Sequence, residues 1–109
     1  MPPINTRGEY NTLAAAGTTQ ATAAECNADM VMVTSGTQGA GVIIRPLNVR
    51  EEQVVCNGTS GTSSIDLYVY PRSGGQINNS GANVHLILPS GRAARFRAID
   101  GAGNVIAFF

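Results

Sequence analysis

The sequence predicts an all-β fold: a small antiparallel β-sandwich or barrel of jelly-roll type, with an extended N-terminal arm. Short apolar runs, rich in β-branched and aromatic residues, are separated by clusters of Gly, Ser, Thr and Asn, the pattern of strands and turns. The runs recur about every 8–12 residues, a spacing typical of sandwiches and barrels. No long helical segment separates them, so we expect antiparallel pairing, because parallel strands need a long crossover.

The expected strands lie within a single β-domain, residues 18–109. The run at residues 65–71 is the clearest, because apolar and more polar side chains alternate in Ile65-Asp-Leu-Tyr-Val-Tyr70. Pro46 indicates a strand end or an edge position for its run. The full set of expected strands is residues 19–23, 30–34, 42–47, 52–57, 65–71, 76–78, 83–88, 92–99 and 105–109.

Residues 1–17 differ from the rest and are expected to form an arm. The segment is polar with two prolines, then continues as Leu13-Ala-Ala-Ala before a glycine. Ala and Leu favour helix and Gly17 is a suitable C-terminal stop, so one turn of helix is expected here. A helix this short is not stable alone, and arms of this kind are often ordered against a partner.

Composition excludes several classes of partner. The chain of 109 residues has seven Arg and Lys, all of them Arg, against seven acidic residues, so its net charge is zero. This balance gives no attraction to nucleic acid or to an anionic membrane, and no apolar run is long enough to span one. The N-terminus lacks the pattern of a secretory signal, so synthesis in a cytoplasm is expected. Only 13% of residues are charged, so either partners cover much of the surface or the chain is a monomer with a weakly charged surface.

Residues that carry catalysis are scarce, and we expect no enzyme, no cofactor and no metal site. His85 is the sole histidine, and no Ser-His-Asp or Cys-His arrangement includes it. We expect it to be a surface or interface residue. Cys26 and Cys56 have no metal-site spacing. A reducing compartment favours free, buried thiols, while a disulfide between them remains an alternative.

Two clusters are candidate contact residues. Arg95 and Arg97 share one face of an expected strand and can bind carboxylates of a partner, or simply face solvent. Tyr68 and Tyr70 lie beside Asp66, and tyrosine is enriched at interfaces. The same tyrosines can alternatively form a stacking platform for a sugar.

Several motifs resemble those of small virion proteins of tailed phages. They are the run from Leu13 to Ala23 (LAAAGTTQATA), the run from Leu67 to Asn78 (LYVYPRSGGQIN) and the later Pro-Ser-Gly-Arg92 followed by Ala94-Arg-Phe96. The resemblance covers roughly residues 13–100. Members of this group often carry Trp near the end, where this chain has Phe108 and Phe109.

The resemblance implies a capsid decoration, or cement, protein: a homotrimer at three-fold positions on the capsid exterior that binds the major capsid protein. On this hypothesis the arm lies along the capsid and removal of residues 2–16 leaves a folded trimer that no longer binds. The expected capsid or subunit contacts are Ile4, Arg7, Tyr10, Leu13, Asp66, Tyr68, Tyr70, Arg95 and Arg97. The alternative is a receptor- or glycan-binding head-fibre or tail-associated module that uses Asp66, Tyr68 and Tyr70.

Overall fold

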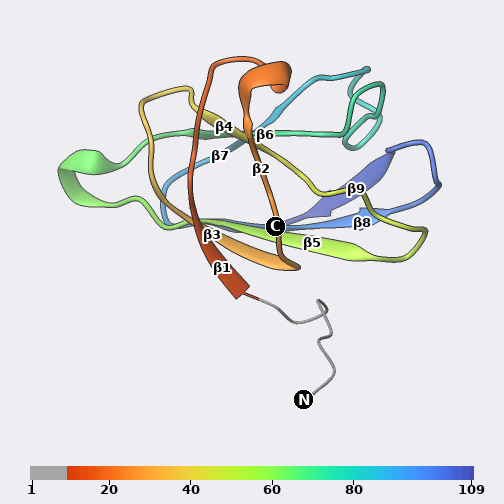
Figure 1. Ribbon diagram of the computed structural model, residues 1–109, viewed down its shortest axis with the longest axis horizontal. Helices are drawn as coiled ribbons and strands as arrows, with labels where there is room; N and C mark the ends of the chain where they lie inside the picture. The colour runs from red at the N-terminus through yellow and green to blue at the C-terminus, as the bar shows by residue number, and fades with distance from the viewer. Residues whose placement is uncertain (1–9) are drawn as a thin grey trace.

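The computed structural model describes residues 10–109, which form two β-sheets on either side of one hydrophobic core (Figure 1). The five-stranded sheet has the order β1-β3-β5-β8-β9 and consists of Tyr10–Ala14 (β1), Met30–Ser35 (β3), Glu52–Asn57 (β5), Ala93–Ala98 (β8) and Val105–Phe108 (β9). The four-stranded sheet has the order β2-β4-β6-β7 and consists of Ala24–Glu25 (β2), Gly41–Ile43 (β4), Leu67–Tyr70 (β6) and Leu86–Leu88 (β7). Two short 3-10 helices, Gln20–Thr22 (η1) and Gly61–Ser63 (η2), lie in connections. The all-β prediction is therefore confirmed.

The chain alternates between the two sheets from β1 to β6. Because every second strand returns to the same sheet in the same direction, β1, β3 and β5 run parallel, and so do β2, β4 and β6. Among the named strands of the described residues, β5 with β8, β6 with β7 and β8 with β9 pair antiparallel, and one isolated antiparallel bridge joins Ala16 to Gly41. The prediction of a purely antiparallel fold was wrong. Its premise was a helical crossover between parallel strands, whereas here a strand of the opposite sheet provides each crossover.

Three local predictions were also wrong, each for an identifiable reason. The expected strand at residues 19–23 contains η1, where the Thr22 amide donates to the Thr19 carbonyl and the two threonine hydroxyls hydrogen-bond at 2.8 Å. The expected helical turn near Leu13 is instead part of β1, because pairing with β3 overrides the weak helix preference of Leu-Ala-Ala-Ala. The expected strand at residues 76–78 is reduced to one bridge, between Ile77 and Val105.

The strand predictions at residues 30–34, 52–57, 92–99 and 105–109 are confirmed in position, and those at 42–47, 65–71 and 83–88 are confirmed with shorter strands. The predicted arm contains β1, so residues 10–14 belong to the five-stranded sheet. A deletion of residues 2–16 would therefore remove an edge strand and not only an arm. Residues 1–9 lie outside the described residues.

The core is formed by the inward side chains of both sheets. Along β5, buried and half-buried side chains alternate. Val55 points into the core between two buried polar residues, Gln53 and Asn57. The Asn57 amide donates to the carbonyls of Ile65 and Leu88 at 2.8 Å each, while its oxygen accepts from the Thr59 hydroxyl at 2.6 Å. Asn57 thus ties β5 of one sheet to β7 of the other, and its buried polar groups are all satisfied.

Candidate functional site

The outward side chains of the five-stranded sheet form a surface that crosses all five of its strands. Strand register places five of them side by side in one row across all five strands. This "outer row" consists of Tyr10, Met30, Val54, Arg95 and Phe108. Tyr10 is 51% exposed, Met30 45% and Phe108 38%. An aromatic or apolar side chain at four of five positions is unusual for a solvent-facing sheet, so the outer row is a candidate interaction surface.

Charged side chains border the outer row and fix its polar edge. Glu52 Oε2 lies 3.6 Å from both Arg95 Nε and Arg97 Nη1. The Arg95 guanidinium carbon lies 5.1 Å from the centroid of the Phe108 ring, a cation–π geometry. Exposed ion pairs at this distance contribute little to stability, so these groups remain available to a partner at little cost.

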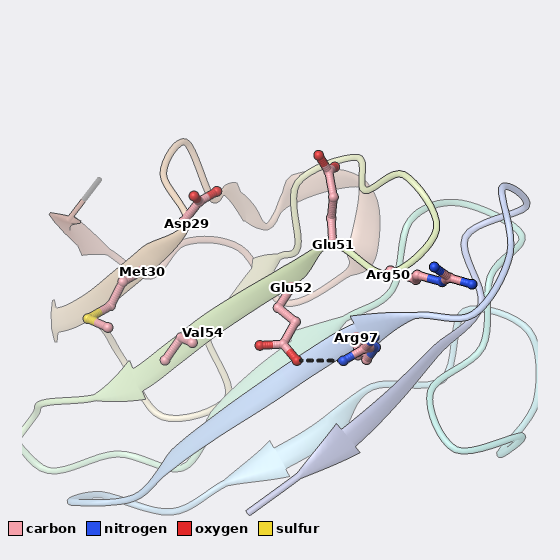
Figure 2. Close-up of a pocket in the computed structure, with 7 residues that line it drawn as sticks. All are labelled: Asp29, Met30, Arg50, Glu51, Glu52, Val54 and Arg97. Carbon is pink, nitrogen blue, oxygen red and sulfur yellow. Dashed lines mark ion pairs between the residues drawn. The ribbon is translucent and has the colours of Figure 1, made fainter. Parts of the chain in front are cut away.

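A hollow of about 430 Å³ lies at the start of β3 and β5, beside the outer row (Figure 2). Figure 2 shows Met30 and Val54 on one side of it, with the Glu52 carboxylate directed toward Arg97. The remaining lining residues are Asp29, Arg50 and Glu51. Asp29 also binds Arg45, with 2.8 Å between Oδ1 and Nη1. The hollow thus places apolar, acidic and basic side chains next to one another, an arrangement that can bind a protein surface with complementary apolar and charged groups.

Arg50 gives the rim of this hollow a fixed backbone shape. Its φ of 75° is in the left-handed region, which an arginine adopts at an energetic cost. The conformation is held because the Arg50 amide donates to Ala98 carbonyl at 3.0 Å and the Ala98 amide donates to Glu51 carbonyl at 3.0 Å. The loop between β4 and β5 is therefore anchored to the end of β8.

Asp66, Tyr68 and Tyr70 lie on the outer face of the other sheet and do not gather with Arg95 and Arg97. The Tyr68 and His85 rings are stacked, with 3.9 Å between centroids and 6° between planes. Tyr70 is only 5% exposed, and its hydroxyl donates to the Thr18 carbonyl at 3.3 Å. Burial, and to a smaller extent Tyr68, raises the pKa of Tyr70. Asp66 and Gln38 hydrogen-bond through the Asp66 amide and carboxylate.

The other predicted contact residues divide between the surface and the interior. Tyr10 is in the outer row, whereas Leu13 packs partly buried against the core. Ile4 and Arg7 lie outside the described residues. The contact role of every one of these residues stays a prediction.

The two thiols are free and differ in environment. Cys26 is buried, and burial, with a smaller effect of Glu25, raises its pKa from 9.0 to about 12, while Arg45 acts in the opposite direction. Cys56 is half-buried on the outward side of β5. Within residues 10–109, no group of three or more His, Cys, Asp or Glu is arranged to hold a metal ion.

Sequence reasoning missed Met30, Val54 and Phe108 as members of one surface. Alternation within each strand could have shown that they face away from the core, but only the pairing of strands distant in sequence shows that they are neighbours. Tyr10 was singled out as part of an arm and is instead the end of the outer row.

Comparison with known proteins assigns no family: no family model, no curated protein and no solved structure matches the chain. The resemblance to phage virion proteins therefore stays a prediction. Among the described residues, no helix is long and apolar enough to cross a membrane.

Proposed function

We propose that the chain is a structural protein that decorates and stabilises a tailed-phage capsid by binding the major capsid protein through the outer row. Two parts of the proposal rest on the sequence resemblance: the homotrimer at three-fold positions and the location on the capsid exterior. Together with this function we propose a two-layered β-sandwich as the architecture of the chain. The observation that carries the proposal is the outer row itself, with Tyr10, Met30 and Phe108 exposed on one sheet face.

The outer row has the composition of a protein-binding surface. Tyr, Met, Phe and Arg are enriched at interfaces, and all four occur in it. Its members lie on hydrogen-bonded strands of one sheet, where the backbone is held by at least one neighbouring strand, so binding requires little ordering of the chain. Many copies that bind one shell gain avidity from their number, so each interface can be small.

The alternative function, receptor or glycan binding through Asp66, Tyr68 and Tyr70, uses side chains that the chain itself largely occupies. His85 stacks against one face of Tyr68, and little of Tyr70 is exposed. A stacking platform needs a free aromatic face, so the outer row supports the decoration role better than these tyrosines support the alternative.

A pair of matched substitutions tests the proposal. Met30 and Ile87 are similarly exposed, at 45% and 50%, but lie on the outer faces of different sheets. In binding assays with capsids of the phage that encodes the chain, Met30→Asp should abolish binding, because it buries a charge in the interface. Ile87→Asp should bind like the wild type. The reverse pattern would place the capsid-binding surface on the four-stranded sheet and contradict the role of the outer row.

Abundance and mass test the remaining parts of the proposal. Quantitative mass spectrometry of the virion should find a copy number comparable with that of the major capsid protein, whereas a few copies would indicate a receptor-binding part. Light scattering should give three times the chain mass of 11.3 kDa. A monomer at high concentration that is absent from virions contradicts the proposal.

A further inference from the structure

We propose that a second hollow, beside β9, binds a neutral saccharide. This "amide hollow" has a volume of about 370 Å³, and its walls carry the side chains of Gln76, Asn78, Asn79, Asn104, Ile99 and Ile106. The volume is at the lower end of the range for small-ligand sites, about 300–1,000 Å³. No charged side chain lines it, in contrast to the hollow beside the outer row.

The walls of the amide hollow are held in place by hydrogen bonds to the backbone. Two backbone hydrogen bonds join residues 76–78 to Val105. The Val105 amide donates to the Gln76 carbonyl at 2.9 Å, and the Asn78 amide donates to the Val105 carbonyl at 3.0 Å. Asn78 and Asn79 both have left-handed φ, 53° and 59°, in a tight turn closed by the Ser80 amide, which donates to Ile77 carbonyl at 3.1 Å. A saccharide would therefore meet preformed groups, which lowers the entropic cost of binding.

The hydrogen bonds within the walls determine which groups remain for a ligand. The side-chain oxygens of Asn78 and Asn104 accept from the amides of Ala107 (2.9 Å) and Gln76 (3.1 Å), and that of Gln76 accepts a long bond of 3.4 Å from Gly81. An amide whose oxygen is occupied still has its NH2 group as a donor. Gln76 and Asn78 thus offer donors, and the exposed Asn79 side chain adds a donor and an acceptor.

A sugar is the class of ligand that these groups fit. Hydroxyl groups both accept from NH2 donors and donate to an amide oxygen. Ile99 and Ile106, 55% and 38% exposed, offer apolar surface to the C–H face of a sugar ring. A ligand with a phosphate or carboxylate group would find no cationic side chain to bind it, since the lining residues are uncharged. The inference uses neither the outer row residues nor the decoration role.

The test follows side-chain NH2 resonances in ¹H–¹⁵N spectra while glucose, galactose, N-acetylglucosamine, maltose and lactose are added separately. At least one sugar should shift the resonances of Gln76, Asn78 and Asn79 saturably, with a Kd on the order of 1 mM, as expected for few hydrogen bonds. Asn79→Gly keeps the left-handed backbone and removes the side chain, so it should weaken binding about 3–10-fold. Asn83→Gly, at a φ of 64° outside the hollow, is the control: it removes the bond that Asn83 Oδ1 accepts from the Gly74 amide at 2.7 Å, and it should bind normally.

Several outcomes overturn the inference. These are no saturable shift with any of the sugars, unchanged binding by Asn79→Gly, or shifts of the backbone amide resonances of Tyr68 and His85 instead. An acetylated, amidated Gly-Ser peptide that shifts the same NH2 resonances while the sugars do not would show that the ligand class is wrong. None of these outcomes bears on capsid binding by Met30→Asp, so the two proposals fail separately.

Discussion

The outer faces of the two sheets differ in how far the chain itself covers them. On the four-stranded sheet, Ile43 and Tyr70 are 8% and 5% exposed, because the segment around η1 packs over this end and Gln20 Nε2 donates to Pro71 carbonyl at 2.6 Å. On the five-stranded sheet, the aromatic ends of the outer row remain exposed.

This difference in exposure indicates which face of the molecule binds a partner. Covering apolar surface stabilises a fold by about 25 cal/mol per Å². A chain that covers one end of the four-stranded sheet but leaves the outer row open forgoes that gain on the open side. An apolar face that stays open in this way marks an interaction surface more convincingly than single exposed residues do. Ile87, at the edge strand β7, is a single exposed residue of that kind.

Asn57 connects the two sheets, and Asn57→Ala should break this connection. The substitution removes the bonds to Ile65 and Leu88 and leaves buried carbonyls without a donor. We expect the free energy of unfolding to fall by about 3–5 kcal/mol. Urea denaturation measures this, with Asn11→Ala as the control, since the exposed Asn11 makes one bond of 3.2 Å to Asn27. A loss below about 1 kcal/mol would contradict the bridging role.

A matched pair of tyrosines tests the two faces directly. Tyr70→Ala should lower stability by about 2–4 kcal/mol, because it removes a buried ring that packs over Gly41. Tyr10→Ala removes an exposed ring from the outer row and should cost less than about 1 kcal/mol. Thermal and urea unfolding of both variants measure the difference. Similar losses for the two would show that the faces are equally covered.

The buried thiol of Cys26 gives a pH test of the core. Because burial raises the pKa of Cys26 to about 12, the unfolded chain ionises this thiol first, from its ordinary value of 9.0 upward. Stability is therefore retained below pH 9 and lost as pH rises from 9 toward 12, at up to about 1.4 kcal/mol per pH unit. Cys26→Ala should reduce this slope in urea unfolding to the part that the raised pKa of Tyr70 contributes. Tyr70 titrates in both proteins, so an unchanged slope in Cys26→Ala would refute the assignment.

The smallest expected effect concerns His85, which covers Tyr68. His85→Ala should lower stability by only about 0.5–1 kcal/mol, the usual contribution of a stacked ring pair. It should also make Tyr68 more accessible to acrylamide, seen as stronger quenching of tyrosine fluorescence than in the wild type. If quenching does not change, His85 does not cover the Tyr68 ring, and the two faces differ less than we describe.

Local alternation explains what could be predicted from the sequence. The run around Leu67 alternates apolar and more polar residues, a pattern that needs no knowledge of neighbours, so this strand and its inward face were predictable. Residues 52–57 were predictable as a short strand, but their inward side chains, Gln53, Val55 and Asn57, follow no apolar alternation in the sequence. Parallel pairing was not, because the crossovers are strands of the opposite sheet and have no helical signal. The outer row depends on the same pairing, which joins Tyr10 to Met30 and Met30 to Val54.

Buried polar residues show a second limit. Asn57 lies in an apolar run, and its composition alone suggests a weak strand end. Its role follows from carbonyls at Ile65 and Leu88, which are brought to it only by the finished fold. The amide hollow has the same origin, since Gln76 and Asn104 meet through a hydrogen bond between distant segments.

Oxidation of Met30, compared between the free chain and the chain bound to capsids, tests the central proposal most directly. An exposed methionine is readily converted to its sulfoxide, and a covered one is protected. We predict that Met30 is oxidised rapidly in the free chain and becomes strongly protected on the capsid, while Tyr68 keeps the same reactivity toward hydroxyl radicals in both states. Equal oxidation of Met30 in both states, with protection at Tyr68 instead, would contradict the assignment of the outer row as the binding surface.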